Sequence, residues 1–393
     1  MDLTESRDKD HPDTAPKIGP RHPPFTLPAS DSPTRETTPR AAHLIDCDVH
    51  IGMGTESLLR ARLPPPWRQY AESYGITGFP GRNYPRRTRN AARDDAWPPS
   101  GGTPGSDLDF MAQQHLDPYG VTYAIVGPAR IYTSRVPGLA HAVAVAMNDW
   151  TAAEWLDRDR RLRGSLFIPI EHPHVAVEEI ERIGCSDRRF VQVYASILTS
   201  RPLGNSYYWP IYEAACEYDL PVSFHFGGSG GGNRPTAAGW PSFYIEEHAG
   251  NALSFQEQVV SLVCEGVFER FAKLRIVLIE GGVAWLPPLA WRLDRAYSHF
   301  RGEVPTLKRL PSEYLRDHFW LTSQPIEEPP RANGFRDMLD GFPGLEDQLL
   351  FSSDYPHWDF DDPRYALRKA RLGPDVAEKI RWQNAAQLFG LGC

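Results

Sequence analysis

Residues 349–354 read LLFSSD: three apolar side chains are followed by two serines and an aspartate. The same change from apolar to ionisable residues ends three other short hydrophobic runs, IDCDVH (45–50), PVSFH (221–225) and RIVLIE (275–280). Apolar runs of this length are typical of buried strands. Ionisable side chains at the ends of several such runs indicate one functional edge of a parallel sheet, where α/β enzymes commonly place their chemistry.

Eight short apolar runs are spaced along the chain, and they are HLIDCD, VTYAIVGP, RGSLFIPI, RFVQVYAS, LPVSFHF, LRIVLIEGG, HFWLTSQ and DQLLFSSD. Segments with helical periodicity separate most of them, namely 139–156, 175–183, 208–218, 253–271 and 285–300. This alternation predicts parallel strands joined by crossover helices. An open doubly wound sheet would also fit. The count of eight and the polar strand ends favour an α/β fold of the (β/α)₈ barrel type, closed by helices within 363–391.

Two stretches fall outside this alternation. Residues 1–40 are rich in Pro, Asp, Thr and Arg and predict a flexible or surface-draped N-terminal arm. Residues 41–393 would then form a single barrel domain. Residues 63–105 contain PPPW, GFPGRNYPRR and WPPSGGTPG, which predict a long irregular loop inserted after the first strand. Its Trp and Arg residues favour a loop that covers something.

The composition limits the partners of the protein. Fifty acidic residues against 42 basic ones give a formal net charge of -8, which argues against a nucleic-acid partner. Neither a bilayer-spanning apolar run nor the apolar core of a signal peptide is recognisable. The five cysteines are scattered and suggest neither a disulfide framework nor a thiolate zinc site. We expect a cytoplasmic homodimer that acts on a small molecule and has no membrane or nucleic-acid partner.

Three residues in two of the runs have the chemistry of metal ligands. Asp48 and His50 are two positions apart on a strand, so both side chains point to the same side. A carboxylate beside an imidazole commonly binds zinc or manganese, although a turn-capping Asp and a surface His would explain the pair equally well. His225 has apolar neighbours, as core histidines usually do. The loop GGSGGGN that follows it would let a metal or substrate approach.

Three further residues are candidates for catalysis or substrate binding. Asp354 follows deep apolar residues, where a carboxylate is costly unless it meets a cation. Capping the next helix is the alternative role, and Asp361 suits that role better. Glu280 ends an apolar run and is either a general acid/base or the partner of an interior arginine. Arg130 follows the second run and either clamps a substrate carboxylate or forms a surface salt bridge.

The segments that carry these residues resemble the amidohydrolase-2 family of the amidohydrolase superfamily. This family includes aminocarboxymuconate-semialdehyde decarboxylase and the resorcylate-type decarboxylases. The resemblance rests on IDCDVH, LPVSFHFGG, LRIVLIEGGVAWLP and LLFSSDYPHWD, and it extends from about residue 44 to the C-terminus. It implies one divalent metal ion, zinc with manganese as the alternative, held by Asp48, His50, His225 and Asp354. Asp354 would also accept a proton from metal-bound water or shuttle one.

The chain departs from the family pattern at two positions. Many members have His-x-His on strand one, where this chain has Asp48-x-His50. Many also have a catalytic histidine at the end of strand six, where this chain has Glu280. His248 and His357 are further imidazoles that could take the place of the strand-six histidine. Alternatively, they could lie behind the ligands or at the surface.

The expected function is that of a metal-dependent hydrolase or carboxy-lyase. Its substrate would be a small carboxylated molecule, aromatic or unsaturated. The reaction would be non-oxidative decarboxylation or hydrolysis by metal-activated hydroxide, with Asp354 and Glu280 as the catalytic groups. A true hydrolase of an amide, lactone or carbon–carbon bond is the alternative. A non-catalytic homologue that binds metal or ligand is a further one.

Overall fold

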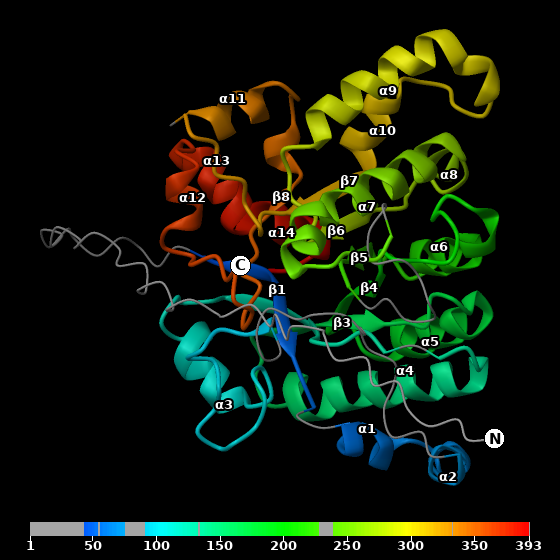
Figure 1. Cartoon of the computed structure of the whole chain (residues 1–393), viewed down its shortest axis with the longest axis vertical. Helices are drawn as coiled ribbons and strands as arrows, with labels where there is room; N and C mark the ends of the chain where they lie inside the picture. Colours follow the sequence, from blue (N-terminus) through cyan, green and yellow to red (C-terminus); the bar gives the residue numbers. More distant parts are fainter. Residues whose placement is uncertain are drawn as a thin grey trace, which may run out of the picture. The chain divides into compact units, whose positions relative to one another are not determined.

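A computed structural model describes residues 43–53, 56–74, 91–132, 134–227, 239–331 and 333–392. The predicted arm, residues 1–40, lies outside the described residues. The described part contains a sheet of eight parallel strands, each hydrogen-bonded to the next in chain order, with helices around them (Figure 1). The strands are β1 (Ile45–Ile51), β2 (Tyr123–Pro128), β3 (Leu162–Phe167), β4 (Phe190–Ser196), β5 (Val222–His225), β6 (Ile276–Ile279), β7 (Phe319–Thr322) and β8 (Leu349–Leu350). All eight predicted runs therefore form strands.

The first and last strands meet, so the sheet closes into a barrel. Val49 and Tyr355 form a parallel bridge. The backbone N–H of Cys47 donates to the carbonyl of Phe351 over 2.9 Å, and that of His50 donates to Tyr355 over 2.7 Å. Closure excludes the open doubly wound sheet and confirms the TIM-barrel prediction.

Helices follow most strands and cover the barrel from outside (Figure 1). They are α1 (Glu56–Arg62), α2 (Pro65–Ser73), α3 (Leu108–Met111), α4 (Pro137–Thr151), α5 (Pro173–Ser186), α6 (Trp209–Glu217), α7 (Tyr244–Cys264), α8 (Val267–Arg270), α9 (Leu286–Phe300), α10 (Pro311–His318), α11 (Gly334–Asp340), α12 (Ala366–Lys369), α13 (Pro374–Glu378) and α14 (Asn384–Phe389). The five periodic segments all correspond to helices. The segment 253–271 is divided between α7 and α8, because Gly266 has a φ of 72° and ends the first helix.

One prediction about the inserted loop was wrong in part. The stretch 63–105 was expected to be irregular throughout, but residues 65–73 form helix α2. Two prolines occupy its first positions, where the missing N–H groups would have no helical partner anyway. Trp67 and Tyr70 then pack against the core, which stabilises the helix. Residues 75–90 of the predicted loop lie outside the described residues.

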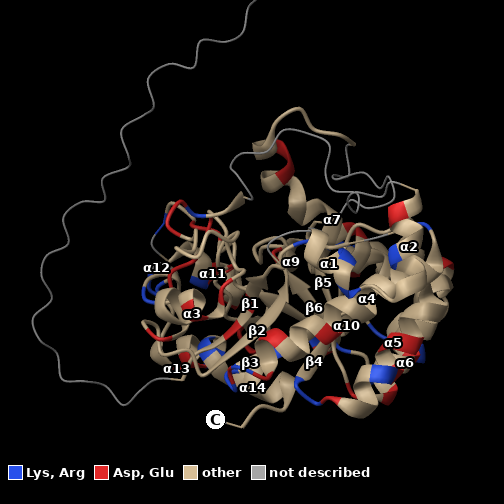
Figure 2. Cartoon of the chain, turned by 90° about the horizontal axis from the view of Figure 1, so that it is seen from below, with Lys and Arg blue, Asp and Glu red and all other residues tan. Residues whose placement is uncertain are grey.

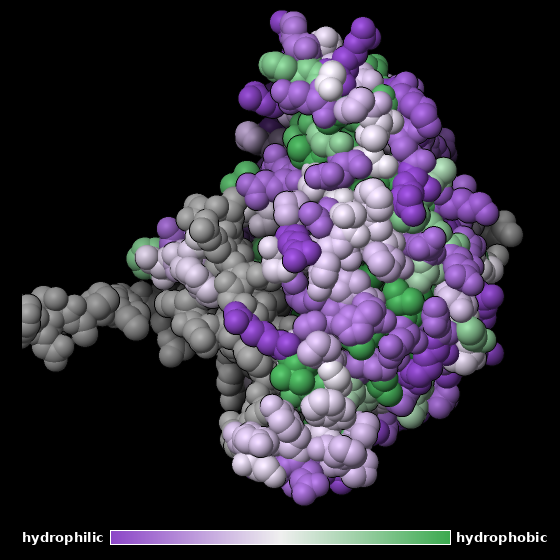
Figure 3. Space-filling model, turned by 90° about the vertical axis from the view of Figure 1, so that its right-hand side faces the viewer, coloured by the Kyte–Doolittle hydropathy of each residue, from purple (hydrophilic) through white to green (hydrophobic). Residues whose placement is uncertain are grey.

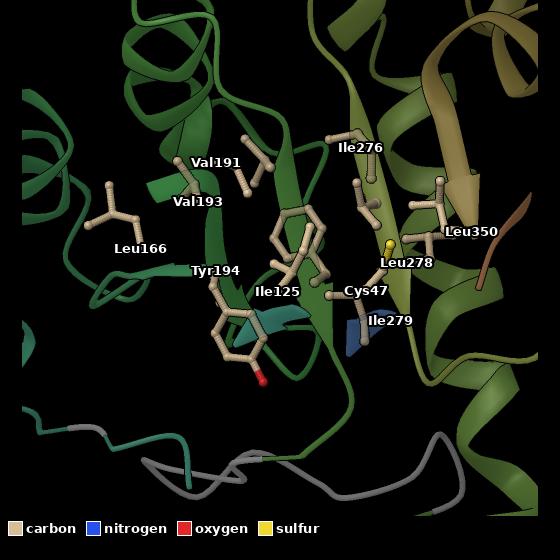
Figure 4. Packing of buried hydrophobic residues seen from close by; sticks show 14 of the residues in the cluster. Cys47, Ile125, Leu166, Val191, Val193, Tyr194, Ile276, Leu278, Ile279 and Leu350 are labelled. Atoms are coloured by element: carbon tan, nitrogen blue, oxygen red, sulfur yellow. The ribbon is translucent and has the colours of Figure 1, made fainter. Parts of the chain in front are cut away.

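The barrel is filled by apolar side chains. Ile125, Leu166, Val193, Leu278 and Leu350 are at most 1 % exposed, and Figure 4 shows them within the core. Lys, Arg, Asp and Glu are interspersed over the outer helices (Figure 2), and the face shown in Figure 3 is mainly hydrophilic with small hydrophobic areas. No helix in the described part has the length and apolarity to cross a membrane. A filled barrel leaves its two ends for function, and the enzymes with this fold use the C-terminal end of the strands.

Candidate active site

The four predicted metal ligands lie together at the C-terminal end of the barrel. Asp48 and His50 are on β1, His225 is the last residue of β5, and Asp354 follows β8. Each is at most 5 % exposed. The barrel brings β1 and β8 side by side and places β5 across from them, so residues far apart in sequence face one cavity.

The distances among these residues are those of a ligand set. Nε2 of His50 lies 2.9 Å from an oxygen of Asp354 and 3.4 Å from an oxygen of Asp48. Nε2 of His225 lies 3.6 Å from the other oxygen of Asp48. Donor atoms about 2.1 Å from a tetrahedral metal ion are roughly 3.4 Å apart. Two overlapping groups could hold an ion, Asp48–His50–His225 and His50–Asp354–His357, and His50 belongs to both.

The donor atoms of this set are unsatisfied within the described protein. Oδ2 of Asp48, Nε2 of His50, Nε2 of His225 and Oδ2 of Asp354 are buried without a hydrogen bond to any described residue. Nδ1 of His225 pairs with the carbonyl of Phe226. A carbonyl only accepts, so Nδ1 carries the proton and Nε2 keeps its lone pair for a ligand. Buried polar atoms without partners are costly, and a divalent cation would satisfy all four.

The two imidazoles beside Asp354 have pKa values shifted in opposite directions, one by burial and the other by the charge of Asp354. Burial lowers the pKa of His50 to about 3, which leaves this side chain neutral and able to bind a cation. His357 lies 2.7 Å from Asp354 through Nδ1. Burial alone would lower the pKa of His357 as well, but the charge and hydrogen bond of Asp354 raise it to about 9. His357 therefore pairs with Asp354 as a cation and orients its carboxylate.

Two site residues have an unusual backbone conformation. Asp354 and Glu280 have φ angles of 58° and 65°, in the left-handed region that non-glycine residues rarely adopt. Such residues cost roughly 1–3 kcal/mol each and concentrate at functional sites. Glu280 directly follows β6, and Asp354 comes shortly after β8, so both unusual conformations lie at the C-terminal end of the barrel.

Asp46 holds the ends of β1 and β8 together. This fully buried carboxylate accepts hydrogen bonds from the backbone of Ser353 over 2.9 Å, the hydroxyl of Ser353 over 2.5 Å and Nε2 of His115 over 2.8 Å. It also accepts from the backbone of Asp48 over 3.3 Å. Asp46 therefore fixes the residues next to two of the predicted ligands. The sequence analysis missed it, and its spacing of two from Asp48 gives no guide to its direction, because the register of β1 shifts between Asp46 and Val49.

Glu280 lies beside the predicted ligands. Its Oε2 is 3.4 Å from Nε2 of His225, and its side chain is 12 % exposed. Its backbone is held by the side chains of Asn251 and Thr322, at 2.8 and 3.1 Å. The carboxylate thus lies next to the predicted ligand His225, and its catalytic role stays a prediction.

A second group of polar side chains lies next to Glu280. Nε2 of His248 on α7 donates to Asp359 over 2.8 Å, and the amide of Gln324 donates to the same oxygen over 2.8 Å. His248, Glu280 and Asp359 lie close enough together to form one group of potential ligands. The ring of Trp358 lies 5.0 Å from that of His248. Asp359 and Gln324 were not singled out from the sequence. Their positions after β8 and β7 were the only sign that they lie at the C-terminal end of the barrel.

Arg130 lies two residues after β2, at the same end of the barrel, with an exposed side chain. Its predicted role in binding a substrate carboxylate remains a prediction.

A model of the amidohydrolase-2 family matches residues 45–391, which is nearly the whole barrel. The chain belongs to this family. Relatives of this amidohydrolase include γ-resorcylate decarboxylase from Polaromonas sp. (strain JS666), which is 26% identical over 276 residues, 64% of this chain and 77% of the relative. Another is γ-resorcylate decarboxylase from Rhizobium sp. (strain MTP-10005), 23% identical over 310 residues, 72% of this chain and 88% of the relative.

Solved structures share the fold of this amidohydrolase. An amidohydrolase from Mycobacterium avium subsp. paratuberculosis K-10 aligns over 90% of this chain and 100% of its own, with a TM-score of 0.66 and 18% identity. A dihydroxybenzoic acid decarboxylase from Polaromonas sp. JS666, with bound manganese and the inhibitor 2-nitroresorcinol, aligns over 89% and 97%, with a TM-score of 0.62 and 21% identity.

Proposed function

We propose that this amidohydrolase is a metal-dependent decarboxylase of a small aromatic carboxylate. The observation that carries the proposal is the convergence of Asp48, His50, His225 and Asp354 at the C-terminal end of the barrel, where four of their donor atoms have no hydrogen bond to a described residue. The activity of the γ-resorcylate decarboxylases supports the reaction class. A divalent ion held by these residues would bind substrate oxygens and stabilise negative charge on them.

The residues around the metal set would perform the rest of the reaction. The carbon–carboxylate bond breaks, carbon dioxide leaves, and the electron pair stays on the ring carbon. Glu280 would donate a proton to that carbon and regain one from solvent, and Asp354 would shuttle protons beside it. Arg130 would attract the substrate carboxylate at the entrance through its guanidinium group. The bond that breaks and the bond that forms balance without an oxidant.

The test is a turnover assay on purified protein loaded with manganese or zinc. Hydroxybenzoates such as 2,6-dihydroxybenzoate should release carbon dioxide, and a chelator should abolish the release until metal is restored. Hydrolytic cleavage of amide or lactone substrates without carbon dioxide release would favour the hydrolase. Stoichiometric metal without turnover of any substrate would favour a binding protein and overturn the proposal.

The metal and the assembly are proposals of the same kind. Two carboxylates and two imidazoles suit both zinc and manganese. Zinc is the metal expected from the sequence, and the Polaromonas structure contains manganese. Elemental analysis of protein grown with each metal distinguishes them. A cytoplasmic homodimer remains our expectation, and light scattering would measure the oligomeric state. The four described cysteines are free.

A further inference from the structure

Tyr194 is a buried residue of β4 whose hydroxyl has no hydrogen-bond partner among the described residues. Its side chain is 1 % exposed, and the hydroxyl makes no hydrogen bond to any described residue. An unsatisfied buried hydroxyl costs roughly 1–3 kcal/mol. Such a group calls for an explanation, because native proteins rarely leave one without a partner.

The side chain of Tyr194 crosses the mouth of the barrel. Its ring centroid lies 5.6 Å from that of His225. A Cβ placed on Gly127 would lie 3.2 Å from the ring and 3.4 Å from the carbon that bears the hydroxyl. Gly127 belongs to β2, which is not a hydrogen-bonded neighbour of β4, so the side chain must extend inward over β3. The register pairs Gly127 with His50, so the hydroxyl end of Tyr194 lies on the side of the predicted ligands.

The surroundings of the hydroxyl favour a neutral donor. Burial, followed by the negative charges of Asp48, Glu280 and Asp354, raises the pKa of Tyr194 well above its ordinary value. A phenol of ordinary pKa, about 10, already keeps its proton at neutral pH, so the donor role does not depend on this shift. Figure 4 shows its oxygen pointing away from the aliphatic core, toward the C-terminal ends of the strands.

From this geometry we propose that the Tyr194 hydroxyl donates a hydrogen bond to an anionic oxygen of the bound substrate, a carboxylate or phenolate oxygen beside His225. The substrate oxygen would supply the acceptor that the described residues do not offer, and Gly127 provides the space in which the ring can extend. The inference rests on the proposed function, because it requires an anionic oxygen at the metal set. It adds a substrate-binding residue on β4, a strand that contributes none of the predicted ligands.

The test is Tyr194→Phe, measured on full-length, manganese-loaded protein with 2,6-dihydroxybenzoate. The substitution removes an unpaired hydroxyl, so the urea midpoint should stay the same or rise, and the bound manganese should be unchanged. The hydrogen bond to a charged oxygen would be lost, so kcat/KM should fall roughly 10- to 100-fold. A role in packing alone predicts no change in kcat/KM.

Tyr212→Phe is the matched control. Tyr212 lies on α6, away from the predicted ligands, and is as buried as Tyr194. Its hydroxyl donates to the carbonyl of Leu203 over 2.7 Å. This variant should lower the urea midpoint and leave kcat/KM unchanged. Gly127→Ala, which crowds the Tyr194 ring, should lower kcat/KM while the hydroxyl is still present.

The outcomes separate the inference from the proposed function. If wild-type protein with bound manganese neither binds nor converts 2,6-dihydroxybenzoate or related hydroxybenzoates, the proposed function fails. If wild type converts them and Tyr194→Phe stays within twofold of its kcat/KM, the inference alone fails. A Tyr194→Phe variant that loses stability as Tyr212→Phe does, with activity falling only in proportion, would also overturn the inference.

Discussion

Removing the Asp46 carboxylate should destabilise the barrel and weaken metal binding together. Asp46 accepts from two backbone N–H groups, the Ser353 hydroxyl and His115, all at a fully buried position. Hydrogen bonds to a charged group contribute roughly 1.5–3 kcal/mol each, but their effects overlap when one residue makes them all. Asp46→Ala leaves these donors unpaired and should cost about 3–5 kcal/mol of unfolding free energy, as breaking a buried charged network does.

Asp46→Asn should be milder, because its remaining oxygen still accepts. Its amide would face Nε2 of His115, which must then give up its proton and move it to Nδ1. Nδ1 of His115 is buried and has no hydrogen bond to a described residue, so a proton there would be unpaired. The cost of one such buried group is roughly 1–3 kcal/mol.

The effect on metal binding follows from the position of Ser353. Asp46 holds Ser353, and the next residue, Asp354, has a φ of 58° that the surrounding bonds must maintain. Without those bonds, Asp354 can leave this strained backbone conformation, which releases up to about 1–3 kcal/mol. Metal binding would then have to restore the conformation, so the affinity for the metal should fall roughly 5- to 150-fold.

Urea unfolding of the metal-free protein and calorimetric titration of manganese measure the two effects separately. The control is Asp157→Asn, which removes a carboxylate from a surface pair with Arg189 and should cost about 0–1 kcal/mol. The reasoning is refuted if Asp46→Ala is as stable as the control, or if it loses stability and binds manganese like wild type.

Three further predictions concern the predicted ligand His225, the predicted acid Glu280, and a buried histidine away from the site. His225→Ala should weaken metal binding by more than the roughly 10- to 100-fold expected for an outer hydrogen-bonding partner, with an unchanged circular dichroism spectrum. Glu280→Gln should keep the metal and lower kcat by roughly 100-fold or more. Burial lowers the pKa of His318, which stacks on Phe268, below its ordinary 6.5. The unfolded chain then binds more protons, so stability should fall as pH drops below about 6.5, and His318→Asn should reduce that slope in urea titrations.

Each of these has a clear contrary result. Full metal occupancy in His225→Ala would make His225 a core residue. Unchanged turnover with lost stability in Glu280→Gln would assign Glu280 a structural role. An identical pH slope in wild type and His318→Asn would show that other groups control stability in that range.

The sequence predicted the barrel because each strand carries its own local signal. Apolar runs such as RIVLIE end in an ionisable residue, and periodic segments between them indicate the crossovers. Helix α2 was missed because three prolines in a row resemble a loop, whereas two of them occupy the positions of a helix that tolerate proline. The barrel closure depends on contacts between β1 and β8, which have no local signal, and it could be inferred only indirectly, from the count of strands and their polar ends.

The predicted ligands were recognisable, but their supporting residues were not. Asp48, His50, His225 and Asp354 end apolar runs and therefore stand out. Their assignment as ligands stays a prediction, although the structure places them together. Asp46 has the same local pattern as Asp48, and only the three-dimensional partners distinguish a structural carboxylate from a candidate ligand. Nothing in the sequence near Tyr194 distinguishes it from an ordinary core aromatic.

The proposed decarboxylase and the alternative hydrolase would make different demands on the charges at the mouth of the barrel. Asp48 and Asp354 would together balance a divalent cation, and the cationic His357 beside Asp354 would add positive charge, so the loaded centre would not repel an anionic substrate. Glu280 is a third carboxyl, 3.4 Å from His225. Ionised, it would repel a substrate carboxylate; protonated, it would donate a hydrogen bond and hold the proton that the ring carbon needs. Hydrolysis would need the opposite state, since Glu280 as the predicted base would have to be ionised to take a proton from water. One residue cannot begin both reactions in the same form, so, if Glu280 has the proposed catalytic role, its proton in the substrate complex would decide which reaction this site performs.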